Sequence, residues 1–238
     1  MKKFVTPPSP ARRMPTIISA VIFDCDGVLV DSEVLAHEVE TEVLAAIGLH
    51  YDAQDFKARF MGLSDRAFLA ELEIDGVARL GRSIVTDIRA PLQAGYRRAI
   101  EERLVEVPGA LAAIKAVRRA KAVASSSTTK GLEEKLRKVG HWDYFAPHVY
   151  SSEHVARSKP APDLFLHAAN ALRVEPAHCL VIEDSIMGVR AGQAAGMRVW
   201  GFVGGGHSDE RSVAALRDIG VERIIEDWQE AGPLLAAL

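Results

Sequence analysis

Short apolar runs, most of them followed at once by polar or acidic residues, recur along this sequence and restrict what it can fold into. They occupy residues 17–23, 122–124, 179–182 and 198–203. Amphipathic helical patterns lie between them, such as residues 111–117 and 132–139, with Gly140 where a helix end favours glycine. Strands that alternate with helices predict a doubly wound α/β fold, with a parallel sheet covered by helices on both faces.

Residues 32–106 break this alternation. They show helical periodicity, for example at Leu35, Val39 and Val43, and no convincing buried strand. We therefore predict an all-helical cap domain of residues 32–106, inserted into a Rossmann-like core domain of residues 17–31 and 107–238. Pro91 should end or kink the later helix of the insertion. Residues 1–16 are rich in proline and basic residues and are predicted to form a flexible leader.

Composition excludes several classes of function. A chain of 238 residues with 48% hydrophobic side chains can bury a sizeable core. Its formal net charge of -3 gives no general electrostatic reason to bind nucleic acid or an anionic membrane surface. The two cysteines, Cys25 and Cys179, lie in apolar runs and are expected to be buried thiols rather than a disulfide. No apolar stretch is long enough to span a membrane. We expect a cytoplasmic protein that binds neither nucleic acid nor membrane, as a monomer with a dimer left open.

Polar side chains gather where the predicted strands end. In open parallel α/β sheets, ligands bind beyond the carboxyl ends of the strands. Carboxylates packed together there repel one another, and Mg²⁺ relieves this repulsion well, since it prefers oxygen ligands and pairs with phosphate. Lys159 lies in a proline-restricted loop and could supply the positive charge that a phosphate needs. The residues at the strand ends are, in chain order, Asp24, Asp26, Ser125, Ser126, Glu183 and Asp184.

These residues also stand in a familiar order. Asp-Cys-Asp-Gly-Val at residues 24–28, then Ser125, Lys159-Pro160 and Glu183-Asp184 resemble the motifs of haloacid dehalogenase phosphatases. The resemblance extends from residue 17 to the end, in the subgroup with a helical cap that includes β-phosphoglucomutase and sugar-phosphate phosphatases. It implies a Mg²⁺-dependent phosphatase that hydrolyses a small phosphate monoester through an aspartyl-phosphate. A sugar or sugar-acid phosphate is the preferred substrate class.

The resemblance implies roles for the acidic residues. Asp24 would attack phosphorus, and Asp26 would act as general acid and base. Asp24 and Asp184 would bind Mg²⁺ through their side chains and Asp26 through its backbone carbonyl. Glu183 would be either a metal ligand or an outer-shell partner.

Phosphate and substrate contacts follow from the same resemblance. Ser125 and Lys159 would orient the transferring phosphoryl group. Ser126 is a further candidate phosphate contact, with a purely structural role as its alternative. Arg66 in the insertion is a candidate contact for the rest of the substrate. The alternative interpretation is that this segment only starts a helix, capped by Ser64.

Rival functions are disfavoured by particular residues. A phosphosugar mutase of the β-phosphoglucomutase type is the main alternative. In such mutases a histidine assists the general acid where this sequence has Ala36, and His37 would point about 100° away on a helix. A dehalogenase needs no second aspartate at the position of Asp26, and a phosphonatase needs a cap lysine near the apolar Met61. A catalytically silent binding protein is disfavoured by the intact set of motif residues.

Two further features are assigned no chemistry. The glycine run at residues 204–206 lacks the ending of a nucleotide-binding loop and predicts a turn beside the site. Surface or capping roles are predicted for histidines without metal-ligand spacing, namely His37, His141, His154 and His207.

Overall fold

The computed structural model describes residues 17–60, 63 and 65–238, so the predicted leader of residues 1–16 lies outside the described residues. The described residues contain a six-stranded sheet of order β3-β2-β1-β4-β5-β6, in which all neighbouring strands are parallel. This architecture confirms the predicted fold class. The strands are β1 (Ala20–Phe23), β2 (Ala120–Ser125), β3 (Val149–Ser151), β4 (Cys179–Glu183), β5 (Arg198–Phe202) and β6 (Arg223–Ile225).

Strand β1 lies in the middle of the sheet, and both of its neighbours extend one or two residues beyond its end. Phe23 pairs with Val123 of β2 on one side and with Ile182 of β4 on the other. The strand order reverses at this point, because β2 and β3 follow on one side and β5 and β6 on the other. Such a switch point leaves a crevice beyond the carboxyl ends of the strands. Asp24, the residue after β1, lies at this end of the sheet.

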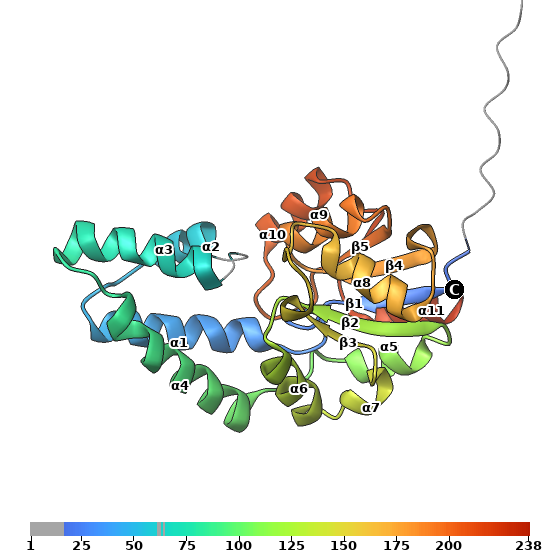
Figure 1. Cartoon of the computed structure of the whole chain (residues 1–238), viewed down its shortest axis with the longest axis horizontal. Coiled ribbons are helices and arrows are strands. Elements are labelled where there is room, and N and C mark those ends of the chain that lie inside the picture. The colour runs from blue at the N-terminus through green and yellow to red at the C-terminus, as the bar shows by residue number, and fades with distance from the viewer. Residues whose placement is uncertain (1–16, 61–62, 64) are drawn as a thin grey trace, which may run out of the picture.

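Helices cover both faces of the sheet (Figure 1). Val21 and Phe23 of β1 belong to one apolar cluster, while Ala20 and Ile22 belong to another on the opposite face. This period of two with both faces buried explains why the strand reads as a continuous apolar run. Helices α5 (Ala110–Ala116), α6 (Thr129–Lys138), α7 (Trp142–Phe145) and α11 (Trp228–Ala236) supply the first cluster, and α8 (Asp163–Leu172), α9 (Ile186–Ala194) and α10 (Glu210–Asp218) the second.

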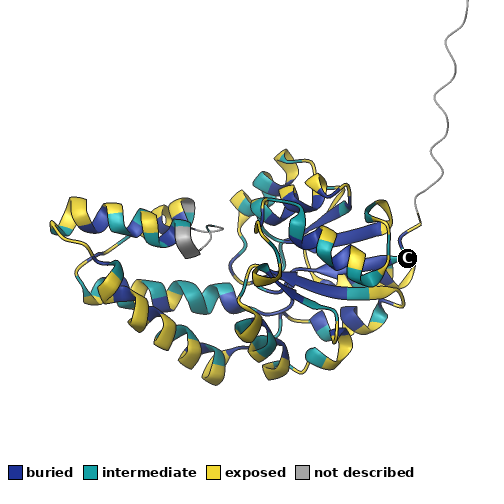
Figure 2. Cartoon of the chain, in the orientation of Figure 1, coloured by how far each residue is buried: buried dark blue, intermediate teal, exposed yellow. Residues whose placement is uncertain are grey.

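Residues 32–103, between β1 and α5, form a helical insertion at one end of the molecule (Figure 1). Its helices bury an apolar cluster of their own, which includes Leu44, Phe56, Leu72 and Ile88. Figure 2 shows the exposed residues on the outward faces of these helices. The domain boundaries at residues 31 and 107 stay a prediction. The insertion comprises α1 (Ser32–Ala46), α2 (Ala53–Phe60), α3 (Asp65–Asp75), a π-helical turn η1 (Gly76–Leu80) and α4 (Val85–Arg103).

The two connections between sheet and insertion run side by side in opposite directions. Asp31 donates its backbone N–H to the carbonyl of Val105 at 3.1 Å, and Val107 donates to Leu29 at 3.0 Å. An isolated antiparallel bridge joins Val30 to Glu106 between them. The insertion therefore leaves the sheet through a paired ribbon rather than through two independent linkers.

Some elements differ from expectation. Strands β3 and β6 were not predicted, because each has only three residues and shows no distinct apolar run. Pro91 was predicted to end or kink its helix; it does not end it, since α4 continues to Arg103, and the kink stays a prediction. The buried residues Leu92 and Ala99 pack this helix in the insertion's core, and that burial outweighs the backbone hydrogen bond that proline removes.

A close helix contact within the insertion gives a first prediction. A Cβ at Gly95 of α4 would lie 2.5 Å from Cγ1 of the buried Val39 of α1. Alanine favours helix by about 1 kcal/mol, whereas overpacking costs about 1–3 kcal/mol. We expect Gly95→Ala to lower the free energy of unfolding by about 1 kcal/mol, as measured by urea denaturation. A Gly95→Ala protein more stable than the unaltered chain would contradict this packing.

Candidate active site

Acidic side chains from β1 and β4 meet at the switch point of the sheet. Asp24 follows β1, and its backbone N–H donates to the carbonyl of Ile182 at 2.9 Å, which places it beside the end of β4. One carboxylate oxygen each from Asp24, Glu183 and Asp184 lies within 4.8 Å of the others. The side chains of Asp24 and Glu183 are only 8% and 1% exposed. Three of the four predicted strand-end acids thus form one buried cluster.

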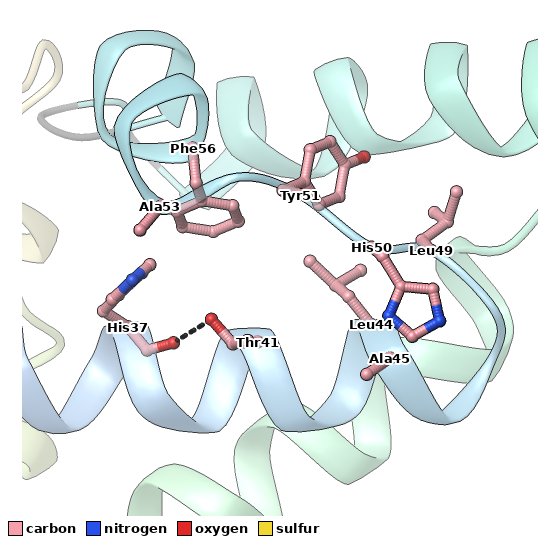
Figure 3. A pocket seen from close by; sticks show the side chains of 9 residues that line it. All are labelled: His37, Thr41, Leu44, Ala45, Leu49, His50, Tyr51, Ala53 and Phe56. Carbon is pink, nitrogen blue, oxygen red and sulfur yellow. Dashed lines mark hydrogen bonds between the residues drawn. The ribbon is translucent and has the colours of Figure 1, made fainter.

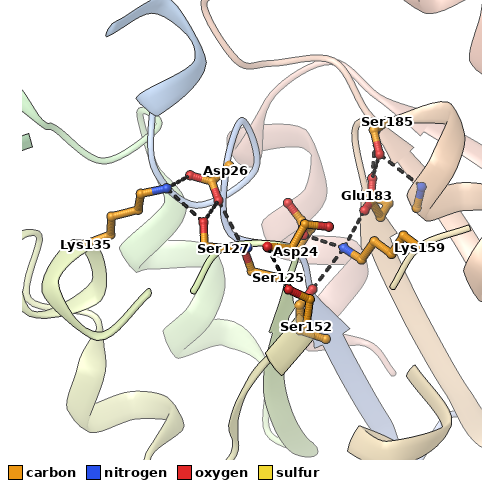
Figure 4. Close-up of polar contacts among 12 residues, drawn as sticks. Asp24, Asp26, Ser125, Ser127, Lys135, Ser152, Lys159, Glu183 and Ser185 are labelled. Atoms are coloured by element: carbon orange, nitrogen blue, oxygen red, sulfur yellow. Dashed lines mark hydrogen bonds and ion pairs between the residues drawn. The ribbon is translucent and has the colours of Figure 1, made fainter. Parts of the chain in front are cut away.

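Lys159 neutralises part of this cluster (Figure 4). Its Nζ donates to Asp24 Oδ1 at 2.5 Å, to Glu183 Oε1 at 2.7 Å and to the carbonyl of Ala124 at 3.0 Å. The ammonium also lies over the ring of Phe165, 4.9 Å from its centre. Burial lowers the pKa of Lys159, but the two carboxylates outweigh burial and hold that pKa above its usual range. The lysine is therefore a charged partner of both acids.

The cluster suits a hard divalent cation. Burial raises the pKa of Asp24 well above its usual range, opposed by Lys159 and reinforced by Glu183 and Asp184. Burial and Glu183 likewise raise the pKa of Asp184. One ammonium does not balance these carboxylates, and their oxygens are the donors that Mg²⁺ prefers. The donor set thus fits the predicted cofactor.

Glu183 is held by the start of α9 as well as by Lys159. Its Oε2 accepts hydrogen bonds from the backbone N–H of Ser185 at 2.7 Å and from the Ser185 hydroxyl at 2.9 Å. A Cβ at Gly188 would lie 1.6 Å from Glu183 Oε1, so glycine at that position makes room for the carboxylate. Both oxygens of Glu183 consequently have partners within the protein.

Asp26 lies in a separate network. Its Oδ1 accepts hydrogen bonds from Ser32 at 2.5 Å and from Lys135, and its Oδ2 accepts them from Ser125 at 3.2 Å and Ser127 at 2.8 Å. Figure 4 shows Asp26 directed toward Lys135 and Asp24 toward Lys159. Burial would raise the pKa of Asp26, but the charge and hydrogen bond of Lys135 and the serine hydroxyls hold it well below its usual range.

Lys135 is a residue of this network that the sequence reasoning missed. It lies on α6 with a side chain only 12% exposed, and its Nζ also donates to the Ser127 hydroxyl at 3.0 Å. Lys130, on the same helix, has a side chain that is 82% exposed. No sequence signal separates these two lysines, because only the docking of α6 against the sheet brings one of them to Asp26.

The predicted phosphate-binding serines lie in different surroundings. Ser125 is fully buried, and its hydroxyl accepts a hydrogen bond from the backbone N–H of Ser127 besides donating to Asp26. Ser126 is exposed, and its carbonyl accepts a hydrogen bond from Ser152 at 2.9 Å. The structure therefore joins Ser125, but not the side chain of Ser126, to the network of predicted site residues.

His207 was predicted to have a surface or capping role, and that prediction is wrong. It is 8% exposed, and its Nε2 lies 3.0 Å from Asp184 Oδ2. His141 is also buried and lies 2.8 Å from Glu106, away from the acidic cluster. The capping prediction is confirmed for His154, whose ring accepts the backbone N–H of Ser151.

The first turn of α1 adds another acid that was not predicted. Burial, with Asp26 and Asp184 nearby, raises the pKa of Glu33 to about 7. By contrast, the side chain of Arg66 and the residue Met61 lie outside what the structure describes, so their predicted roles stay predictions.

A hollow of about 100 Å³ lies elsewhere, within the insertion (Figure 3). Its lining includes His37, Thr41, Tyr51 and Phe56, and none of the predicted site residues.

Within the described part of the chain, no helix is long and apolar enough to cross a membrane.

Comparisons with known proteins agree with this geometry. A family model described as haloacid dehalogenase-like hydrolase matches residues 18–196. The 6-phosphogluconate phosphatase of Escherichia coli K12 is 29% identical over 191 residues, which cover 80% of this chain and 85% of that protein. A phosphorylated carbohydrates phosphatase of Thermotoga maritima is 32% identical over 194 residues, which cover 78% of this chain and 86% of that protein.

A solved structure points the same way. A haloacid dehalogenase family hydrolase from Deinococcus radiodurans R1, crystallised with bound phosphate and sodium, is 33% identical with a TM-score of 0.77. The match covers 93% of this chain and 96% of that one. The chain belongs to the haloacid dehalogenase-like hydrolase family. The predicted enzyme class, a phosphoric monoester hydrolase of this type, is confirmed.

The contact between Lys135 and Asp26 gives a second prediction. Lys135→Met leaves a buried carboxylate without its ammonium, which should lower the free energy of unfolding at pH 7.5 by about 3 kcal/mol. In this variant only the serine hydroxyls oppose the effect of burial, so the pKa of Asp26 should rise and a lower pH should neutralise the carboxyl group in the folded state. The stability gap to the unaltered protein should therefore narrow from pH 7.5 to pH 5, as measured by chemical denaturation.

The matched control is Lys130→Met on the same helix, whose exposed side chain should change stability by less than about 0.5 kcal/mol. A gap that is equally wide at both pH values would show that Lys135 contributes packing rather than charge.

Proposed function

We propose that this chain is a Mg²⁺-dependent phosphatase that hydrolyses a small sugar phosphate or sugar-acid phosphate through an aspartyl-phosphate on Asp24. One observation carries the proposal. The carboxylate of Asp24 is buried at the end of the central strand, paired with Lys159 and close to Asp184. A nucleophile, a cation for phosphate oxygens and an acidic metal site are the parts that phosphoryl transfer requires.

The metal site we propose uses Asp24 and Asp184 through their side chains and Asp26 through its backbone carbonyl. Glu183 is the outer-shell partner, because Lys159 and Ser185 already occupy both of its oxygens. Mg²⁺ bound there would neutralise negative charge on the transferring phosphoryl group. The glutamate holds Lys159 in place beside Asp24.

In the first step, a free oxygen of Asp24 attacks phosphorus in line and the bond to the substrate oxygen breaks. Lys159 would turn one of its three N–H groups, which now donate to Asp24, Glu183 and the Ala124 carbonyl, to a phosphoryl oxygen. Asp26 would act in its protonated form, which the contact with Lys135 disfavours in the arrangement described above, and give that proton to the leaving alkoxide. In the second step it would take a proton back from the water that attacks the aspartyl-phosphate. The hydroxyls of Ser32 and Ser127 fix the position of the Asp26 carboxylate for both transfers.

The substrate class rests on the relatives and on the insertion. The relatives from Escherichia coli and Thermotoga maritima are named for a phosphorylated sugar acid and for phosphorylated carbohydrates. Residues 32–106 would form the cap domain over the strand ends, where an enclosed pocket favours a small polar molecule. A cytoplasmic monomer remains part of the proposal.

Phosphate release from a panel of sugar and sugar-acid phosphates tests the activity. The purified chain with Mg²⁺ should release phosphate from members of this panel, 6-phosphogluconate among them. Asp24→Asn should lower kcat by about a thousandfold or more, because the amide cannot form the covalent intermediate. Asp143→Asn, a change at an exposed position on α7, is the matched control and should leave kcat unchanged.

The panel also separates the rival functions. If the chain converts a hexose 1-phosphate to the 6-phosphate, and only with trace bisphosphate, it is a mutase and not a hydrolase. If the folded protein with Mg²⁺ releases phosphate from none of the esters, a binding protein is favoured.

Removal of the metal gives a further prediction. Chelation with EDTA should abolish phosphate release, since Asp24, Glu183 and Asp184 then repel the incoming phosphate. Excess Mg²⁺ should restore release in full. Activity that persists after chelation and dialysis would show that the acidic cluster works without a cation.

A further inference from the structure

We propose that His207 is a positioning residue, which fixes the carboxylate of Asp184 for Mg²⁺ binding. The inference rests on the proposed function, because it concerns the metal site of that reaction. Its basis is a buried contact, in which His207 Nε2 lies 3.0 Å from Asp184 Oδ2. The two side chains are 8% and 9% exposed, so water does not compete with this contact.

The surrounding backbone makes room for this pair. A Cβ at Gly27 would lie 2.1 Å from Asp184 Oδ2 and 2.6 Å from His207 Cε1. Gly27 also has a φ of +74°, which other residues rarely adopt. A Cβ at Gly205 would lie 2.8 Å from His207 Nδ1. The Gly27 and Gly205 positions therefore accommodate the pair only without a side chain.

The backbone around His207 is held from both sides. Lys57 of α2 donates from Nζ to the His207 carbonyl at 3.2 Å. Gly206, the preceding residue, donates its N–H to Asp31 Oδ1 at 3.2 Å. These contacts come from the insertion and from the end of its first connection, so the imidazole reaches Asp184 from an anchored loop.

The imidazole contacts Asp184 through Nε2, and this contact restricts which oxygen of the carboxylate can bind the cation. His207 Nδ1 is buried and has no hydrogen-bond partner among the described residues. The contact of His207 Nε2 is with Oδ2 of Asp184, which would leave Oδ1 of the same carboxylate for the cation. A partner that orients a metal ligand in this way typically changes metal affinity by about 10–100-fold when it is removed.

Calorimetric titration of the metal-free protein with MgCl₂ tests the inference without any turnover. His207→Ala should weaken Mg²⁺ binding by about tenfold or more. His207→Gln, which keeps a side-chain N–H donor, should recover most of the affinity. At saturating Mg²⁺ the KM for the phosphate ester should stay close to that of the unaltered chain, because His207 acts through Asp184.

His141→Ala is the matched control, since it also removes a buried imidazole from a carboxylate, that of Glu106, outside the acidic cluster. It should leave Mg²⁺ affinity unchanged, with circular dichroism confirming that each variant is folded. Full Mg²⁺ affinity in folded His207→Ala, or an equal loss in His141→Ala, overturns the inference while hydrolysis by the unaltered chain leaves the proposed function intact. An unaltered chain that binds no Mg²⁺ overturns both.

Discussion

A buried ammonium allows the acids of two strands to lie side by side. Lys159 extends from the loop before α8 to contact Asp24, after β1, and Glu183, at the end of β4. Removing one partner of a buried ion pair is strongly destabilising, because the other charge stays buried without compensation. The lysine therefore permits a dense cluster of carboxylates at the centre of the fold. With Asp184 included, the cluster has more negative charge than Lys159 balances. This excess favours a divalent cation.

The strand-end residues could be predicted from the sequence because each buried strand is marked by a short apolar run of neighbouring residues. A fully buried parallel strand reads as an apolar run, and the first polar residue after it must lie at the sheet edge. Asp24 and Glu183 were located by this rule alone. Lys159 was found from its proline-restricted loop and from a resemblance in motif order, since a lone lysine carries no such pattern.

The remaining contacts could not be predicted, because they depend on how distant elements pack. Lys135 and Lys130 lie on one helix and differ only in the face that docks against the sheet. His207 lies in a glycine-rich loop whose path is set by contacts with residues far away in the sequence. Pro91 differs in kind, because a local rule allowed either an end or a kink of the helix, and the apolar packing of α4 excludes the end.

The ribbon that joins sheet and insertion has a mechanical consequence for proton transfer. Ser32 begins α1 directly after this ribbon, and its hydroxyl lies 2.5 Å from Asp26 Oδ1. Because two hydrogen-bonded segments join the insertion to the sheet, a rotation of the insertion about them would displace Ser32 relative to that carboxylate. Under the proposed function, such a rotation would move a hydrogen-bond donor of the proposed general acid, so its readiness to carry a proton would depend on the position of the insertion.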